Sequence, residues 1–337
     1  METILIEKDC LEQAAEIIKR GGLVAMPTET VYGLAADALN GAAVAKIFAA
    51  KGRPMDNPLI VHIADLSQWD GLVREVPEKA RILAETFWPG PLTIILPKAD
   101  CIPDEVSAGL DTVAVRFPSH PVAQELIRRS VPLAAPSANL SGSPSPTNAR
   151  HVWDDMNGRI DAVINGDDCA VGVESTVITL ASDPPRVLRP GGVTVEQLRE
   201  AIGEVTVDSA VLQPLQSGEQ AASPGMKYKH YSPRARIVLL NGPEQAFVDY
   251  VNRHAGEGIA ALCYEEEIPA LNVPVISIGA ENDYAQQANR LFTALREVDE
   301  RGFRLAYAHC PDTEGMGLAV YNRMIRAAGF EVIDLEA

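Results

Sequence analysis

Short runs of aliphatic residues alternate with amphipathic stretches along this chain, and that alternation limits the folds open to it. Residues 23–26 and 59–63 are two apolar runs, and residues 42–50 between them show helical spacing. Hydrophobic residues form 47% of the chain but aromatic residues only 5%, so Ala, Val, Ile and Leu must fill most of the core. Buried strands covered by helices have this composition, which predicts an α/β protein.

Several predicted strands follow one another without an intervening helix. Further strands are expected at residues 92–96, 112–116, 133–135, 162–164, 175–180 and 186–188, and further helices at residues 78–86, 121–129 and 195–201. The helical spacing of Leu11, Ala14 and Ile18 indicates an early helix, with Asp9 as its expected N-cap. Because the strands are not all separated by helices, we expect a twisted mixed sheet rather than a purely parallel one.

The length of 337 residues is too great for one ordinary core and fits two domains. The regular pattern weakens from about residue 203 to residue 223 and returns after Pro233. From there the predicted order is β-α-β-β-α-β-α, which indicates a smaller Rossmann-like α/β domain. We therefore expect one domain at residues 1–205, a linker at 206–235 and a second domain at 236–337.

Composition excludes several classes of protein. The net charge of −17 argues against a chain whose main task is to grip nucleic acid. Five widely spaced cysteines without a C-x-x-C pair predict free thiols in a reducing compartment and no zinc site. The polar N-terminus is unlike a signal peptide, and no run approaches the ~20 apolar residues of a membrane span. We expect a cytoplasmic protein with no membrane partner.

Three polar clusters follow predicted elements. Residues 27–34 (P-T-E-T-V-Y-G-L) directly follow a buried strand, where open α/β sheets bind ligands, although spacing alone favours an ordinary turn. Lys51, Arg53 and Asn57 form either a phosphate grip or a solvated helix end, and spacing does not decide between the two. Residues 133–147 run from a strand into a loop rich in Ser and Asn, whose prolines favour a fixed shape over a flexible loop.

Two common nucleotide-binding motifs are absent or incomplete in the sequence. The Walker pattern G-x-x-x-x-G-K-[ST] does not occur in the sequence. Residues 315–320 (G-M-G-L-A-V) start like a dinucleotide fingerprint but lack its third glycine, so they are interpreted as a packing feature at a helix start.

The order of the motifs is more specific than any one of them. P-T-E-T-V-Y-G-L, K-x-R-x-x-x-N-P-L, D-T-V-A-V-R, P-S-A-N and V-E-S-T follow one another as in the YrdC-like family, which the chain resembles. The later P-G-M-K-Y-K-H-Y-S-P is similar to the linker of the long, two-domain L-threonylcarbamoyladenylate synthases. The resemblance is strong through Tyr231 and weaker beyond it, where Gly317, Asn322 and Arg323 fit the long-form pattern.

The resemblance implies a role for particular residues. Lys51 and Arg53 would be the catalytic cations. The implied ATP contacts are Lys51, Arg53, Asn57, Thr112, Ser137, Asn139, Ser145, Arg189 and Tyr231. The implied threonine contacts are Thr30, His62, Arg116 and Ser175. No residue is expected to bind a metal directly.

Three of these positions also have a reading from the residues alone. Arg116 ends an apolar strand, where a buried arginine needs a partner, and a substrate carboxylate matches its guanidinium; no acidic partner for a structural ion pair can be identified from the sequence. His62 lies inside an apolar strand, where a lone histidine is more often structural. Ser175 either binds a side chain or is a strand-edge hydroxyl.

The implied reaction joins L-threonine, bicarbonate and ATP to give L-threonylcarbamoyl-AMP and pyrophosphate, with Mg²⁺ held through the ATP phosphates. The product would pass to a tRNA threonylcarbamoyl-transferase complex, without strong direct tRNA binding by this chain. The alternatives are a carbamoyl-adenylate-forming carbamoyltransferase and a non-enzymatic RNA-binding module. The cation- and tyrosine-rich segment 223–233 is expected to fold over the nucleotide, anchored by the second domain.

Overall fold

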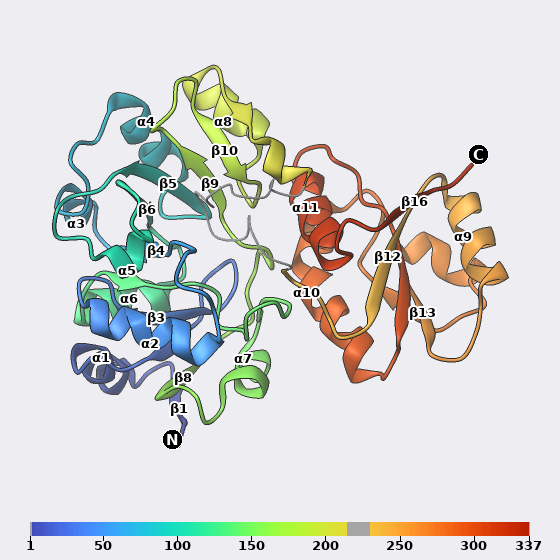
Figure 1. Cartoon of the computed structure of the whole chain (residues 1–337), viewed down its shortest axis with the longest axis horizontal. Coiled ribbons are helices and arrows are strands. Elements are labelled where there is room, and N and C mark those ends of the chain that lie inside the picture. The colour runs from blue at the N-terminus through green and yellow to red at the C-terminus, as the bar shows by residue number, and fades with distance from the viewer. Residues whose placement is uncertain (1, 214–229, 337) are drawn as a thin grey trace. The chain divides into compact units, whose positions relative to one another are not determined.

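A computed structural model describes residues 2–213 and 230–336 of the chain. The chain divides into two compact units, the first comprising Met1–Ser141 and Ser145–Lys227 and the second Gly142–Pro144 and Tyr228–Ala337 (Figure 1). The predicted linker segment at 223–233 lies outside the described residues up to residue 229. No helix among the described residues is long and apolar enough to cross a membrane.

The first unit is built on one eleven-stranded sheet in the order β1-β8-β2-β3-β7-β4-β6-β5-β9-β10-β11. Its strands are β1 (Ile4–Glu7), β2 (Val24–Met26), β3 (Gly33–Asp37), β4 (Ile60–His62), β5 (Leu92–Pro97), β6 (Thr112–Arg116), β7 (Leu133–Ala134), β8 (Ala162–Asn165), β9 (Thr176–Thr179), β10 (Arg186–Arg189) and β11 (Thr206–Val207). The pairs β4–β6 and β5–β9 are parallel, whereas β2–β3 and β5–β6 are antiparallel. The predicted mixed sheet is therefore confirmed. Residues 206 and 207, which we expected to begin the linker, pair with β10 in this sheet.

The helices of the first unit are α1 (Leu11–Lys19), α2 (Gly41–Lys51), α3 (Leu66–Asp70), α4 (Glu78–Phe87), α5 (Asp104–Ser107), α6 (Pro121–Arg129), α7 (Ala149–Met156) and α8 (Val195–Ile202). The predicted apolar face of α1 is buried and shares a core with α6. The predicted cap is wrong, because Cys10 occupies the N-cap position and no side chain accepts a hydrogen bond there. Helix α2 is capped by Asn40, whose side chain accepts from the Ala43 N–H, and it ends at Gly52 in the left-handed region.

Two strands of the first unit lie in segments that were not predicted as strands. Strand β1, with the sequence I-L-I-E, lies in the N-terminal segment interpreted as polar and pairs in parallel with β8. Strand β3 begins at Gly33, inside the segment predicted as a loop, and pairs with β2 across the 27–32 loop.

The second unit holds a five-stranded sheet in the order β14-β13-β15-β12-β16, and all its pairs are parallel. Its elements are β12 (Arg236–Asn241), α9 (Glu244–Arg253), β13 (Ile259–Cys263), β14 (Val275–Ser277), α10 (Tyr284–Glu300), β15 (Leu305–His309), α11 (Gly317–Ala327) and β16 (Val332–Asp334). The predicted Rossmann-like arrangement is confirmed. A Cβ at Gly317 would lie 2.7 Å from the Asp312 carbonyl oxygen, so the second glycine of G-M-G-L is a packing feature at a helix start, as predicted.

Candidate functional site

Strand register places polar residues in one row across the first sheet. His62 is the last residue of β4 and Arg116 the last residue of β6, and these parallel strands bring the two residues into register. On the other side of β6, Arg116 is in register with Thr93 of β5. Side chains opposite one another on paired strands share a face of the sheet. The carboxyl ends of β4 and β6 therefore present a histidine, an arginine and a hydroxyl side by side.

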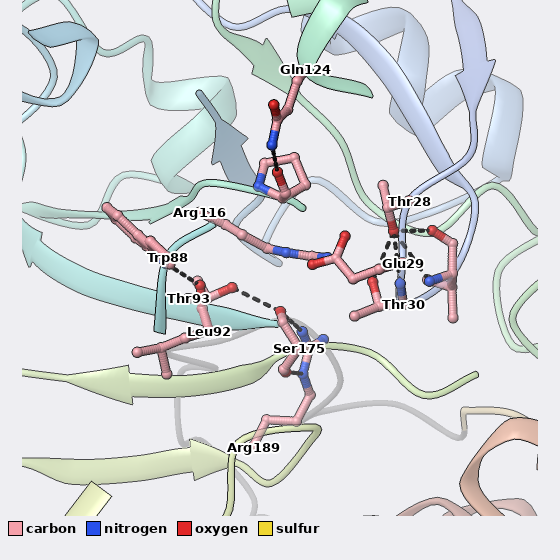
Figure 2. A network of polar contacts seen from close by, with 12 residues as sticks. Thr28, Glu29, Thr30, Trp88, Leu92, Thr93, Arg116, Gln124, Ser175 and Arg189 are labelled. Carbon is pink, nitrogen blue, oxygen red and sulfur yellow. Dashed lines mark hydrogen bonds and ion pairs between the residues drawn. The ribbon is translucent and has the colours of Figure 1, made fainter. Parts of the chain in front are cut away.

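Arg116 has an acidic partner that the sequence does not reveal. Its Nη2 atom lies 2.8 Å from Oε1 of Glu29, in the loop after β2. Both residues are buried, with 3% of Arg116 and 8% of Glu29 exposed. Figure 2 shows the Arg116 side chain directed at Glu29, with Thr28 and Thr30 beside that carboxylate. The ionic alternative considered for Arg116 is thus present in the fold.

The pair is not saturated by hydrogen bonds. Nε and Nη2 of Arg116 and both carboxylate oxygens of Glu29 are buried and have no partner of hydrogen-bond geometry among the described residues. Buried polar atoms are nearly always hydrogen-bonded, so these four need an explanation. A bound molecule with charges of both signs would supply one.

The 27–32 loop is rigidly held. The Thr28 hydroxyl donates to the Val31 carbonyl at 2.6 Å, and its oxygen lies 2.9 Å from the Thr30 hydroxyl. Since Thr28 has one proton to give, Thr30 is the donor in their shared bond and keeps acceptor capacity. The backbone N–H groups of Val171 and Gly172 donate to the carbonyls of residues 29 and 30, which ties the loop to the segment before β9.

Ser175 sits just before β9 and belongs to the same network. Its hydroxyl lies 2.8 Å from that of Thr93 and accepts from Nη2 of Arg189 at 3.1 Å. Nε of Arg189 donates to the Ser175 carbonyl at 3.1 Å. Figure 2 shows these three side chains lying across the site from Thr28 and Thr30. Ser175 is therefore more than an isolated strand-edge hydroxyl.

His62 is uncharged in this environment. Burial, and then the charge of Arg116, lower the pKa of His62 to about 3. Its Nδ1 atom lies 3.2 Å from the Ile60 carbonyl oxygen. The ring can therefore exchange hydrogen bonds near Arg116 without adding a second positive charge.

Lys51 differs from its predicted setting. It is the last residue of α2 and only 3% exposed, so it is neither in a polar loop nor at a solvated helix end. Its Nζ donates to the carbonyls of Ser137 and Asn139 at 2.5 and 2.6 Å. Burial, followed by the charge of Arg53, holds the pKa of Lys51 well below its usual value. Lys51 thus fastens the P-S-A-N loop to the end of α2.

Arg53 and Asn57 lie in the segment between α2 and β4. Arg53 donates through Nη2 to the carbonyls of Asn57 and Pro58, each at 3.2 Å. The Asn57 side chain is fully buried, and both its amide nitrogen and its oxygen have no hydrogen-bond partner among the described residues. An amide in that condition is an open donor and acceptor for a ligand.

The remaining predicted residues fall in three places. Ser145 donates to Oε1 of Glu174 at 2.6 Å, in the segment beside Ser175. Ser137 bridges Gly33 and so connects the P-S-A-N loop to the P-T-E-T loop. Thr112 begins β6, four residues and about 13 Å of strand from Arg116, so the structure does not bring these two together.

Tyr231 belongs to the second unit. Its ring lies 5.2 Å from that of Phe292 and 5.8 Å from the Arg323 guanidinium, measured between ring centroids and to the guanidinium carbon respectively. It is 5% exposed and has a positive φ of 62°, which is uncommon for a residue with a Cβ.

A cavity of 640 Å³ in the first unit lies elsewhere, lined by Ile17, Arg20, Gly22, Leu23, Lys46, Ala49, Ala50, Arg159 and Asp161. It contains none of the predicted site residues. We place the site by its buried polar side chains instead, because unsatisfied buried groups indicate a ligand more directly than a hollow does.

Two residues of the network were not predicted as ligand contacts. Thr93 is a polar residue in the apolar strand L-T-I-I-L, and this interruption is a signal that could have found it. Glu29 stands in the P-T-E-T motif, but only tertiary structure shows that it faces Arg116.

Comparison with known families gives two matches that together span most of the chain. Residues 16–191 match the model described as "Telomere recombination", of the Sua5, YciO and YrdC proteins. Residues 193–329 match the model described as "Threonylcarbamoyl-AMP synthase, C-terminal domain".

Individual proteins are similar over nearly their whole length. The chain is 46% identical to the threonylcarbamoyl-AMP synthase of Pyrococcus abyssi, covering 97% of this chain and 96% of that protein. It is also 46% identical to the threonylcarbamoyl-AMP synthase of Bacillus subtilis, covering 96% and 94%. The crystal structure of P. abyssi Sua5 complexed with L-threonine matches with a TM-score of 0.91 at 42% identity, over 100% of both chains.

Proposed function

The chain belongs to the threonylcarbamoyl-AMP synthase family, and on that premise we propose that it converts L-threonine, bicarbonate and ATP into L-threonylcarbamoyl-AMP and pyrophosphate. The observation that carries the proposal within the structure is the buried, unsaturated Arg116, in register with His62 of β4 and Thr93 of β5 and close to the Ser175 hydroxyl that Thr93 contacts. A free amino acid with a hydroxyl side chain complements those groups.

The reaction has two stages. The amine of threonine attacks bicarbonate to give N-carboxy-threonine and water. The new carboxylate attacks the α-phosphorus of ATP, and the bond to pyrophosphate breaks. No protein nucleophile is needed, so positioning and charge compensation are the expected sources of rate.

The threonine site would consist of Thr30, His62, Arg116 and Ser175. Arg116 would bind the carboxylate with two parallel hydrogen bonds, which a guanidinium is shaped to do. The neutral His62 and the two hydroxyls would contact the remaining polar groups of the substrate. The network around them is held from the backbone, so the site is preorganised.

The ATP site would consist of Lys51, Arg53, Asn57, Thr112, Ser137, Asn139, Ser145 and Arg189, with Tyr231 of the second unit as a further predicted contact. The unpartnered amide of Asn57 supports this, because it lies between the cation Arg53 and strand β4. Lys51 and Arg53 would offset the charge that develops on the α-phosphate and on pyrophosphate. Lys51 would also hold the 137–139 loop in shape.

Mg²⁺ is proposed as the companion of ATP. Among residues 2–213 and 230–336, no group of three or more His, Cys, Asp or Glu side chains is arranged to hold a metal ion. A Mg²⁺ ion here would take its ligands from phosphate oxygens and water, which is its usual behaviour with nucleotides. It would neutralise phosphate charge.

We further propose the division into a catalytic domain at 1–205, a linker at 206–235 and a C-terminal domain at 236–337. The product would pass, in the cytoplasm, to a complex that transfers the threonylcarbamoyl group to tRNA. The net charge of −17 supports delivery by contact with that complex in preference to strong direct tRNA binding.

The test is pyrophosphate release measured with ATP and every combination of L-threonine and bicarbonate, with the nucleotide product identified by mass spectrometry. We expect release only when both are present. Equal release with carbamoyl phosphate in place of both would indicate the carbamoyltransferase alternative. No release under any condition, together with salt-dependent tRNA binding, would indicate an RNA-binding module.

A further inference from the structure

The Arg116–Glu29 contact is close but incompletely satisfied. Two nitrogen atoms lie on one side and two oxygen atoms on the other, all four buried and without a partner of hydrogen-bond geometry among the described residues. A buried ion pair that only supports a fold needs further hydrogen bonds to offset desolvation. Apart from the contact between Arg116 Nη2 and Glu29 Oε1, this pair lacks the accompanying hydrogen bonds among the described residues, so the remaining hydrogen-bonding capacity of these atoms is available to a ligand.

We propose that Glu29 binds the α-ammonium group of the amino-acid substrate while Arg116 binds its carboxylate, an inference that rests on the proposed function. An amino acid at neutral pH carries a positive ammonium group and a negative carboxylate group, and both are attached to its α-carbon. The pair offers the opposite charges side by side in the same buried place. Because both charged groups would be bound, the site would favour amino acids over hydroxy acids and amines, which carry only one charge.

The neighbours of Glu29 favour this assignment. The Thr30 hydroxyl donates its hydrogen bond to Thr28, so its oxygen can still accept a hydrogen bond from an ammonium group. His62 is uncharged, because burial and then the charge of Arg116 lower its pKa to about 3. It therefore does not compete for the Glu29 carboxylate as a cation would. Glu29 would therefore hold the substrate nitrogen in its ammonium form.

The position of Glu29 is fixed by the backbone rather than by its side chain. The Glu29 carbonyl accepts from Val171 N–H, and the Thr30 carbonyl accepts from Gly172 N–H. Replacing the carboxylate by an amide should consequently leave the course of the loop unchanged. This makes Glu29→Gln a usable test of charge.

The experiment is a binding cycle by isothermal titration calorimetry. L-threonine is compared with (R)-3-hydroxybutanoate, which lacks only the ammonium group, on the wild-type chain and on Glu29→Gln. On the wild type, loss of the ammonium should weaken binding by about 10- to 100-fold, the range of a charge-assisted hydrogen bond. On Glu29→Gln, threonine should bind correspondingly less tightly, and its advantage over the analogue should fall to about threefold or less.

Glu29→Gln would overturn the proposal if it weakened both ligands equally, because that result means that Glu29 only holds Arg116 in place. Asp161→Asn is the matched control, since its carboxylate accepts from Leu23 N–H elsewhere in the same unit; it should leave both affinities unchanged. Circular dichroism establishes that each variant is folded.

The wild-type chain alone keeps the proposal falsifiable if Glu29→Gln does not fold. Equal affinities of threonine and its amine-free analogue would overturn it without any substitution. Pyrophosphate release is measured in parallel. If pyrophosphate release depends on threonine but Glu29→Gln leaves the affinity difference between threonine and the analogue unchanged, only this inference is overturned. If the wild-type chain neither binds threonine nor releases pyrophosphate, the proposed function is overturned as well.

Discussion

Among the described residues, each unit of the molecule contains a buried acid–base pair, and the two pairs differ in how completely they are bonded. In the second unit, His309 contacts the Glu267 carboxylate through Nδ1 and the Gly242 carbonyl oxygen through Nε2, the latter at 2.9 Å. The other oxygen of Glu267 accepts from Tyr264 N–H at 2.8 Å. In the first unit, Nη2 of Arg116 lies 2.8 Å from Oε1 of Glu29, but neither these two atoms nor Nε of Arg116 and Oε2 of Glu29 have a partner of hydrogen-bond geometry among the described residues.

The difference in hydrogen bonding indicates a different role for each pair. The Glu267 pair is closed, because both ring nitrogens and both carboxylate oxygens are occupied by the protein itself, and His309 also stacks on Phe247 with centroids 4.6 Å apart. It has the features of a structural support. The Glu29 pair is equally buried but open, which fits a place where a ligand completes the bonding.

Glu267→Gln should produce the largest change in stability. Both oxygens of Glu267 are hydrogen-bonded in a buried place, and loss of a hydrogen bond to a charged group costs about 1.5–3 kcal/mol in free energy of unfolding. Glu29→Gln should cost less, because the native pair makes fewer bonds to lose. Urea denaturation of the two variants and the wild type measures both values. Equal losses would remove the distinction between a closed and an open pair.

Lys51→Met should have the second-largest effect, and it should lower the rate of turnover. Loss of one charge donor at the developing phosphate charge typically costs about 10²- to 10³-fold in rate. Lys46→Met on the same helix is the control, since Lys46 donates to the Gly21 carbonyl and is exposed. The rate of pyrophosphate release is measured for both variants and for the wild type. Near-normal turnover of Lys51→Met would mean that Lys51 only holds the 137–139 loop in place.

Acid should destabilise the first unit through His62. Its pKa is about 3 in the fold and near 6.5 when unfolded, so between these values only the unfolded chain binds the extra proton. Stability contributed by His62 therefore falls as pH falls below about 6.5, by at most about 1.4 kcal/mol per pH unit. From pH 6.5 to 5 this amounts to about 1.6 kcal/mol, because the slope reaches its maximum only below the unfolded pKa. His62→Gln should show a flatter dependence of the urea midpoint on pH over this range.

The opposite, and smallest, pH effect is expected in the second unit. Burial opposes the charge on His309, but the hydrogen bond and charge of Glu267 outweigh it and raise the pKa of His309 above 6.5. A raised folded pKa gives stability that is fully present below the unfolded value and is lost as pH rises through the folded value. Nuclear magnetic resonance titration of the imidazole measures this directly. A His309 pKa below 6.5 would contradict the closed pair.

Local pattern was sufficient for most of the architecture. The apolar runs at residues 23–26, 59–63 and 92–96 became β2, β4 and β5, and the helix predicted at 121–129 became α6 with the predicted bounds. Strands β1 and β3 were not predicted although both contain apolar residues, because β1 lies in a terminal segment interpreted as polar and β3 in a segment interpreted as a loop. The short strands β11 and β16 were also not predicted. The Asp9 cap was wrong because several polar residues precede α1 and only the backbone path selects one.

The sequence by itself determined the class of the protein, the order of its elements and the motifs that would meet at the strand ends, because periodicity and short-range spacing express local preference. Tertiary structure alone decided which charges meet. Spacing leaves Lys51 open between a phosphate grip and a solvated helix end, whereas the fold buries it on the Ser137 and Asn139 carbonyls. No acidic partner of Arg116 can be identified from the sequence, whereas the fold places Glu29 against it. The energy of a charge depends on the groups and the water around it, and those are set by segments far apart in the chain.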